Sequence, residues 1–528
     1  MKRKLLKVIG ISFLIFFVLS WIIPTGTYTG GKLSTDSIAP IGLIDLFNKP
    51  IQAIVTFALY GVVFAAIGGF YGVLEKTLVL DGITDKWSSK FSDKGNKFLI
   101  ITTILFVLLS SLTGLIIPLF ILVPLFARTL FKLNYDKLTV LASTVGGILT
   151  GSIGSTYGFN ITGYTKNLLS LDMNNQILPR IIVLVILTIV LCVTVVLSSK
   201  KSENNDENLN EAKKPESKNE VKKAEVGKDV KKVKNSKTDN VEEKKSSKKT
   251  GSKGKKGSKK TSKSNTKNMA ISQSIKKVSD KPVKTRAFTI LFILMLIVMF
   301  VGMYNWYYSF SIDAFTKIHE AVMGVKVSGF KIFENLLSGA SQFGYWSNVE
   351  FVGLIVFTSM VIGKVYKLSL NDYVEGFISG MKAWMPTAIY VCLANVVLVV
   401  LYQSLQSGTG SLVDTINGTI LGWADGFNPI ITGLATFISS FFFNDLYYLL
   451  ADLSAFTSGY SSSDLSVAGM LIQSVYAVAM MIMPVSTVLI AGLSMFDVSY
   501  GKWMKYIWRF ALISLLLVMI FGGVLTLL

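Results

Sequence analysis

A long polar interruption divides this chain into two apolar regions, residues 51–199 and 287–527. From Lys200 to Arg286 the sequence carries 28 Lys or Arg and 12 Asp or Glu, which gives +16 of the net charge of +21. Such a segment buries too little apolar surface to offset its ordering entropy, so we expect it to be disordered. Lys-rich loops stay on the cytoplasmic side of a membrane, so both apolar regions are expected to meet the insert on that side.

The two apolar regions have the composition of a multi-pass protein of the cell membrane. The chain is 51% hydrophobic with a mean hydropathy of +0.53. Several apolar runs reach the length of about 20 residues that crosses about 30 Å of hydrocarbon. The basic start and the apolar run to Ile23 are too long for a signal peptide and lack a cleavage site, which predicts an uncleaved first span with a cytoplasmic N-terminus. Aromatic residues near span ends are expected to be interface anchors: Trp21, Trp306, Tyr307, Tyr308 and Trp503.

The same composition argues against several classes of function. The excess charge sits in the insert, so we expect anionic lipid headgroups as its partners and no specific nucleic acid. The chain has one histidine, His319, and two cysteines, Cys192 and Cys392, which excludes a Cys/His zinc site and a disulfide framework. It has no Walker A loop and no convergent acid–base set, so we expect neither an enzyme nor a cofactor.

Two segments of the first apolar region do not fit the pattern of a continuous membrane-spanning helix. Residues 98–131 are two short apolar arms around the Ser/Thr/Gly cluster 110–114, followed by a basic loop. This predicts a re-entrant hairpin that enters from the cytoplasm, with its tip buried in protein or lining a wet cavity. Residues 138–160 hold too many Gly and Ser for a continuous helix, which predicts a broken helix.

The second apolar region repeats this order with the opposite orientation. Residues 427–451 predict a second hairpin, entering from outside, and residues 465–498 predict a second broken helix. The fold is therefore predicted to be an all-α polytopic bundle with two inverted repeats, each with a re-entrant hairpin and a broken helix. The predicted organisation is a first span and outer loop (1–50), repeat one (51–199), the disordered insert (200–286), scaffold spans (287–382) and repeat two (383–528).

Polar groups at tips and breaks give such a fold its chemistry. A broken helix offers free N–H groups to a carboxylate and free C=O groups to Na⁺. Asp445 and Asp452 are either intramembrane carboxylates or interfacial ones, and any single Ser or Thr can instead serve helix packing. The candidate substrate or ion ligands are Ser110, Ser111, Thr113, Ser152, Ser155, Thr156, Asn160, Ser439, Ser440, Asn444, Asp445, Gln473, Ser474, Ser486 and Thr487.

Four short strings carry a resemblance to a family. The stretch 21–28 reads WIIPTGTY, and Asn134-Tyr135-Asp136 follows the first hairpin. Phe377-Ile378-Ser379-Gly380-Met381 and Met483-Pro484-Val485-Ser486-Thr487, the latter followed by Tyr500 and Lys502-Trp503, complete the set. Together they resemble the YfcC-like bacterial transporters, relatives of the C4-dicarboxylate carriers. The resemblance covers both apolar regions and implies an ion-transporter fold that moves a small carboxylated solute, with an amino acid ahead of a C4-dicarboxylate.

The sequence thus predicts a secondary active transporter, either an exchanger or coupled to Na⁺ or H⁺. Two alternatives stay open at this point. A channel would conduct in both directions without saturation, and a tethering or assembly protein would act through the basic insert. The sequence also leaves open whether the chain forms a homodimer.

Overall fold

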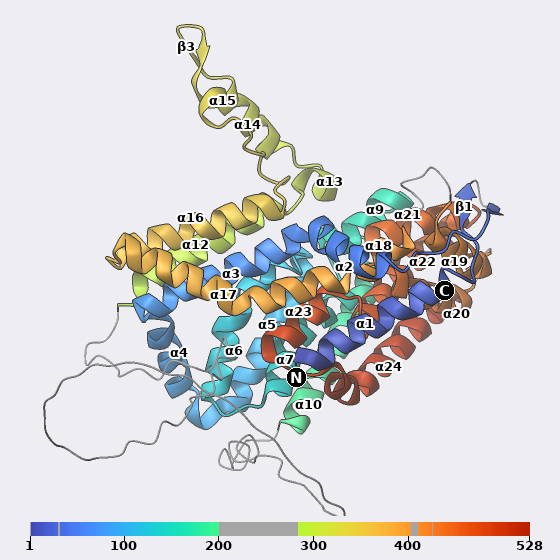
Figure 1. The fold of residues 1–528 in the computed structure, drawn as a ribbon, viewed down its shortest axis with the longest axis horizontal. Coiled ribbons are helices and arrows are strands. Elements are labelled where there is room, and N and C mark those ends of the chain that lie inside the picture. The colour runs from blue at the N-terminus through green and yellow to red at the C-terminus, as the bar shows by residue number, and fades with distance from the viewer. Residues whose placement is uncertain (1, 30–31, 200–283, 403–409, 425) are drawn as a thin grey trace, which may run out of the picture. The chain divides into compact units, whose positions relative to one another are not determined.

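Helices make up most of the chain that the computed structural model describes, which is residues 2–29, 32–199, 284–402, 410–424 and 426–528 (Figure 1). The described strands form two short antiparallel hairpins, β1 (Gly26–Thr29) with β2 (Lys32–Thr35), and β3 (Lys326–Val327) with β4 (Phe330–Lys331). Eight described helical segments are long and apolar enough to cross a membrane. The predicted all-α polytopic architecture is confirmed.

The first repeat runs in the predicted order of long helix, hairpin, broken helix and closing helix. Asp136 begins the broken helix as an N-cap, accepting from the N–H of Leu138 at 3.1 Å. The elements are α2 (Asp45–Thr56), α3 (Ala58–Thr77), α4 (Val79–Lys90), η1 (Ser92–Lys94), hairpin arms α5 (Gly95–Thr113) and η2–α6 (Pro118–Ile121, Val123–Lys132), broken-helix parts α7 (Lys137–Leu141), η3 (Ala142–Gly146), α8 (Gly147–Ile153), η4 (Phe159–Gly163) and α9 (Tyr164–Leu169), and α10 (Ile177–Ser198).

The second repeat has the same order. Asn428 caps the first hairpin arm by accepting from the N–H of Ile430 at 3.0 Å, and Ser461 caps the broken helix by accepting from that of Asp464 at 3.1 Å. The elements are α17 (Leu370–Ala394), α18 (Val396–Leu401), α19 (Leu412–Leu421), η6 (Gly422–Ala424), hairpin arms α20–η7 (Pro429–Ser439, Ser440–Phe442) and α21 (Leu446–Thr457), broken-helix parts α22 (Ser462–Met480) and α23 (Thr487–Phe496), and α24 (Tyr500–Leu525).

The first long helices of the two repeats, α3 and α17, pack against each other in opposite directions. The contacts pair Gly61 with Ala388, Gly68 with Gly380 and Gly72 with Gly376, so residue numbers increase along α3 as they decrease along α17. A Cβ on Gly72 would lie 2.1 Å from the carbonyl oxygen of Gly376. Only glycine permits this approach, which is how small residues bring helices together in a membrane.

Two further long helices lie beside this pair. α12 (Arg286–Met303) packs on α16 (Asn348–Val365), and α16 packs on α3. The chain between them forms α13 (Trp306–Phe310), α14 (Ala314–Met323) and α15 (Ile332–Leu336), and α14 and α15 have no buried residue. The first predicted span is α1 (Lys2–Leu19), which packs on α18.

Two predicted boundaries can be compared with these elements. The boundary between residues 382 and 383 falls inside α17, which is continuous from Leu370 to Ala394. The predicted disordered insert, 200–286, lies outside the described residues except for its last three, where α12 begins at Arg286.

Candidate transport site

The tip of the first hairpin is hydrogen-bonded to the first break. The Ser111 hydroxyl donates to the Gly154 carbonyl at 2.8 Å and shares a hydrogen bond with the Thr156 hydroxyl at 3.2 Å. The backbone N–H of Thr156 in turn lies 3.1 Å from the Ser111 hydroxyl. All three residues are buried, so tip one and break one form one polar unit inside the protein.

Gly114 allows the backbone of this tip to reach the second half of the broken helix. Its φ of +67° lies in the left-handed region, and it ends α5. A Cβ there would lie 2.8 Å from the nitrogen of Phe159 and 3.0 Å from that of Asn160. The Asn160 amide donates to the Gly114 carbonyl at 3.2 Å. The N–H groups of Ile161, Thr162 and Gly163 all donate to the Gly158 carbonyl, whereas those of Phe159 and Asn160 face the backbone of tip one.

Arg180, which hydropathy analysis passed over, fills the other side of break one. It is the fourth residue of α10 and only 1% exposed. Its Nη1 donates to the carbonyls of Ser155 at 3.1 Å and Thr156 at 2.7 Å, and lies 3.0 Å from the Thr162 hydroxyl. Its Nη2 donates to the Met173 carbonyl at 2.6 Å. A lone Arg within the apolar run 178–199 was the sequence signal for this residue.

The second tip and the second break are linked through a third element. The Asn444 amide at tip two donates to the Asn395 side-chain oxygen at 2.8 Å. The Asn395 amide donates to the Thr487 hydroxyl at the start of α23, at 3.4 Å. Asn395 separates α17 from α18 and is fully buried, and its hydrogen bonds join hairpin two to break two. Ser486 is the N-cap of α23.

The carbonyls of break two are braced by the first turn of α24. The Trp503 indole N–H donates to the Met481 carbonyl at 2.9 Å, and the Tyr500 hydroxyl donates to the Ile482 carbonyl. Trp503 is completely buried. The expectation that it anchors the protein at the membrane interface is therefore wrong, because its polar edge is used inside the bundle. Trp21, Tyr307 and Tyr308 are about half exposed.

Two hydroxyls on hairpin two have no hydrogen-bond partner in the described structure. Thr436 and Ser439 are one turn apart on α20, both fully buried, and neither hydroxyl has a hydrogen bond in the described structure. The neighbouring Ser440 instead donates to the carbonyl of Thr436 at 2.6 Å. Unpaired buried polar atoms are costly, and the same condition holds for atoms of Ser309, Thr415, Asn417 and Tyr506.

The two repeats meet around break one. Gln473 on α22 accepts from the Thr165 hydroxyl at 3.3 Å and donates to the Ser155 carbonyl at 3.5 Å. The rings of Tyr164 on α9 and Tyr447 on α21 lie 5.5 Å apart, edge to face. Asp445 is the N-cap of α21, directly before Leu446. Residues from tip one, break one and tip two are therefore neighbours.

Other predicted ligands serve local structure. The Ser110 hydroxyl donates to the Ile148 carbonyl at 2.7 Å and contacts Ser152, which joins α5 to α8. Thr113 donates to the Leu109 carbonyl within its own helix. These contacts match the helix-packing alternative for these three residues. Ser155 shares a hydrogen bond with Thr162 at 3.1 Å, and Ser474 is buried on α22 beside Gln473.

The charges near these elements differ in sign. Arg180 makes no ion pair with a carboxylate of the described chain; Asp172 acts on it at longer range. Asp445 accepts the Tyr447 N–H at 3.0 Å, and no described basic residue pairs with it. The described residues contain no group of three His, Cys, Asp or Glu that could hold a metal ion. The region thus offers neutral ligands with one fixed cation and one fixed carboxylate.

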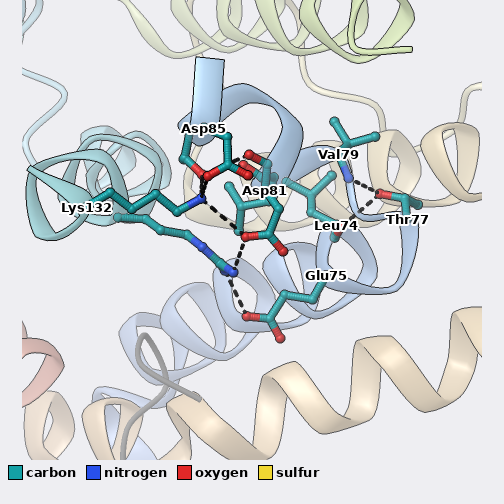
Figure 2. A network of polar contacts seen from close by, with 10 residues as sticks. Leu74, Glu75, Thr77, Val79, Asp81, Asp85 and Lys132 are labelled. Carbon is teal, nitrogen blue, oxygen red and sulfur yellow. Dashed lines mark hydrogen bonds and ion pairs between the residues drawn. The ribbon is translucent and has the colours of Figure 1, made fainter. Parts of the chain in front are cut away.

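An ion-pair network ties the returning arm of hairpin one to the helices before it (Figure 2). Arg128 on α6 contacts Glu75 at 3.4 Å and Asp81 at 2.6 Å. Lys132, one turn further, contacts Asp85 at 2.6 Å and Asp81 at 3.5 Å. These ion pairs link the C-terminus of α3 and helix α4 to α6, at the base of hairpin one.

Comparison with known proteins gives one family match. Residues 244–527 match the family model described as "DcuC: C4-dicarboxylate anaerobic carrier". The crystal structure of the Alcanivorax borkumensis YdaH transporter aligns with 98% of this chain and 97% of its own, at 12% identity and a TM-score of 0.34, a likeness too low to establish a common fold. No curated protein matches the chain.

Proposed function

We propose, from the premise that this chain belongs to the C4-dicarboxylate anaerobic carrier family, that it is a secondary active transporter of a small carboxylated metabolite. The resemblance inferred from short motifs is confirmed by this membership. The chain is a multi-pass membrane protein with eight candidate spans among its described residues. Membership of a carrier family favours transport over catalysis.

The observation that carries the proposal is the seating of two hairpin tips on two helix breaks. Ser111 holds tip one to break one, and the Asn444–Asn395–Thr487 chain holds tip two to break two. Discontinuous helices that meet inside a bundle expose N–H and C=O groups which a continuous helix keeps paired. Such groups can bind a carboxylated solute and release it without a covalent step. The predicted site residues at these tips and breaks are therefore proposed as substrate and ion ligands, apart from Ser110, Thr113 and Ser152, whose hydroxyls serve helix packing.

The charges favour an amino acid as substrate. The N–H groups of Phe159 and Asn160, at the start of η4 and beside tip one, suit a carboxylate. Asp445, which has no basic partner among the described residues, suits the ammonium group of a zwitterion. A C4-dicarboxylate is the second candidate, because the family description names it. It would have to bind without using Asp445, since two negative groups would face that carboxylate.

Transport is proposed to be driven by exchange or by a Na⁺ or H⁺ gradient. The unpaired hydroxyls of Thr436 and Ser439 support an ion position on hairpin two, because neutral oxygens suit a monovalent cation. The N-terminus is proposed to be cytoplasmic. The insert, 200–286, is proposed to contact anionic lipid and to be dispensable for transport.

Uptake by purified protein in proteoliposomes tests the proposal. Labelled amino acids and C4-dicarboxylates are offered with and without a Na⁺ gradient, a pH gradient or internal substrate. We expect saturable uptake that Asn160→Leu and Ser439→Leu abolish while the protein stays folded. Asn371→Leu is the matched control, because Asn371 is exposed on the first turn of α17.

The two rivals predict different results in the same vesicles. A channel would give flux without saturation and without stimulation by internal substrate. A tethering protein would lose its function when residues 200–286 are deleted, whereas a transporter would keep its uptake.

A further inference from the structure

We infer that Arg180 is a resident cation of break one, occupying the carbonyl-lined position that a mobile inorganic ion could otherwise take. The role of this cation in transport rests on the proposed function, whereas the thermal-unfolding test of its binding does not. Four observations lead to it: the burial of the side chain, its acceptors, the absence of a paired carboxylate, and its counterpart in the other repeat.

Burial makes the charge costly. The Arg180 side chain is among the largest fully buried side chains of the described structure, with 1% exposure. A buried ion without an opposite charge carries a desolvation penalty that only well-placed dipoles can offset. Such a residue is retained where its charge has a role.

The acceptors are those that a cation site would use. Nη1 reaches the carbonyls of Ser155 and Thr156 and the hydroxyl of Thr162, and Nη2 reaches the carbonyl of Met173. Neutral oxygens from a helix break, near the negative end of the half-helix α8, form the kind of shell that binds Na⁺ in transporters with broken helices. Here the shell already holds a guanidinium.

The second repeat shows that bracing the break does not need a charge. Arg180 is the fourth residue of α10, the helix that closes repeat one, and Trp503 is the fourth residue of α24, the helix that closes repeat two. Trp503 donates to the carbonyl of Met481 in break two through an uncharged indole N–H. Both positions therefore donate to a carbonyl of the break, Trp503 through one uncharged group and Arg180 through a charged group with more acceptors.

The charge acts on what the site can bind. With Arg180 in place, break one has no vacant carbonyl shell for an inorganic cation, so any coupling ion must bind elsewhere. Hairpin two, with its unpaired Thr436 and Ser439 hydroxyls, is one such place among the described residues. The fixed charge also favours a carboxylate nearby. Arg180 is thus a positioning residue for break one and contributes to anion selectivity.

Thermal unfolding of the purified protein tests the inference without any substrate. Arg180→Ala empties the shell and should lower the Tm in choline chloride. Low millimolar guanidinium chloride at equal ionic strength should then raise the Tm of Arg180→Ala, but not that of the natural protein. Lys166→Ala is the matched control, because Lys166 also donates to two carbonyls, those of Tyr308 and Ser309, outside the break. A variant Tm that responds equally to guanidinium and choline overturns the inference.

A second pair of variants separates charge from hydrogen bonding if Arg180→Ala does not fold. Arg180→Gln keeps donors without the charge, and Arg180→Lys keeps the charge. We expect the KM for the carboxylated substrate to rise about tenfold in Arg180→Gln and less in Arg180→Lys. A KM in Arg180→Gln equal to that of the natural protein overturns the inference, whereas absence of uptake by the natural protein would refute the proposed function alone.

Discussion

Replacing Gly114 with alanine tests whether the meeting of tip one and break one depends on the backbone of one residue. Gly114 has a φ of +67°, where an L side chain costs about 1–2 kcal/mol. Its new Cβ would also lie 2.8 Å from the Phe159 nitrogen and 2.9 Å from the Gly158 carbonyl carbon, so the two segments must separate. Separation weakens the 3.2 Å hydrogen bond from Asn160 to the Gly114 carbonyl, for about 1 kcal/mol more.

The two costs sum to about 2–3 kcal/mol. The stiffer unfolded chain of an alanine variant returns about 0.4–1 kcal/mol of this, so the net expected loss of unfolding free energy in Gly114→Ala is about 1–2.6 kcal/mol. Unfolding of the purified protein in detergent, followed by tryptophan fluorescence, measures the change. Uptake in proteoliposomes should fall even under conditions where the variant is still folded, because the strain lies at the candidate site.

Gly146→Ala is the matched control. Gly146 lies in the same broken helix with a φ of −59°, and a Cβ there would have its nearest contact at 3.6 Å. Alanine is favoured over glycine in a helix by about 0.5–1 kcal/mol, so this variant should be neutral or more stable. If Gly114→Ala behaves like Gly146→Ala in both assays, the close contact between tip one and break one is refuted.

Three further substitutions test other parts of the account. Gly72→Ala should prevent α3 and α17 from packing, because its Cβ would lie 2.1 Å from the Gly376 carbonyl oxygen. The yield of folded, monodisperse protein should therefore fall. Gly353→Ala is the control and should keep the yield, because a Cβ there would have no atom within 4 Å. Asp445→Asn should weaken the inhibition of labelled uptake by unlabelled amino acids by at least about tenfold, because the ammonium group of a zwitterion needs the carboxylate. Inhibition by C4-dicarboxylates should not change, and an equal loss for both would contradict the amino-acid assignment. Arg128→Ala should lower the unfolding free energy by about 1–2 kcal/mol at low salt and by less at high salt, and a loss that does not depend on salt would show that the ion pairs of Figure 2 contribute little.

The order of elements could be predicted from the sequence because each is a local signal. The Gly and Ser cluster of residues 146–158 interrupts an apolar run, and the structure breaks the helix there, between α8 and η4. The hairpin predicted at 98–131 is α5 and α6, and the one predicted at 427–451 is α20 and α21. The prediction of two short arms is wrong for α5, because the helical segment Ser92–Thr113 is by itself long and apolar enough to cross a membrane. Hydropathy and glycine content report directly on such features, since both act through the nearest residues in the chain.

The partners of these elements could not be predicted, because hydropathy does not say which helices meet. Trp503 was assigned to the membrane interface from its place at a span end, whereas its indole binds a carbonyl 22 residues earlier in the chain. Arg180 was missed because one charge hardly changes the hydropathy of a long apolar run. Gln473 was selected as a polar residue in its own broken helix, and the structure shows that it contacts break one of the other repeat.

The central claim is that tips and breaks from both repeats enclose a site that solutes reach from either side of the membrane. Labelling of a single cysteine at position 160 measures this directly, in a variant in which Cys192 and Cys392 are replaced by alanine. A membrane-impermeant maleimide should label Asn160→Cys in proteoliposomes both when it is added outside and when it is enclosed, and a transported substrate should slow both reactions. Labelling only after detergent solubilisation, or at a rate that no transported solute changes, would contradict the account.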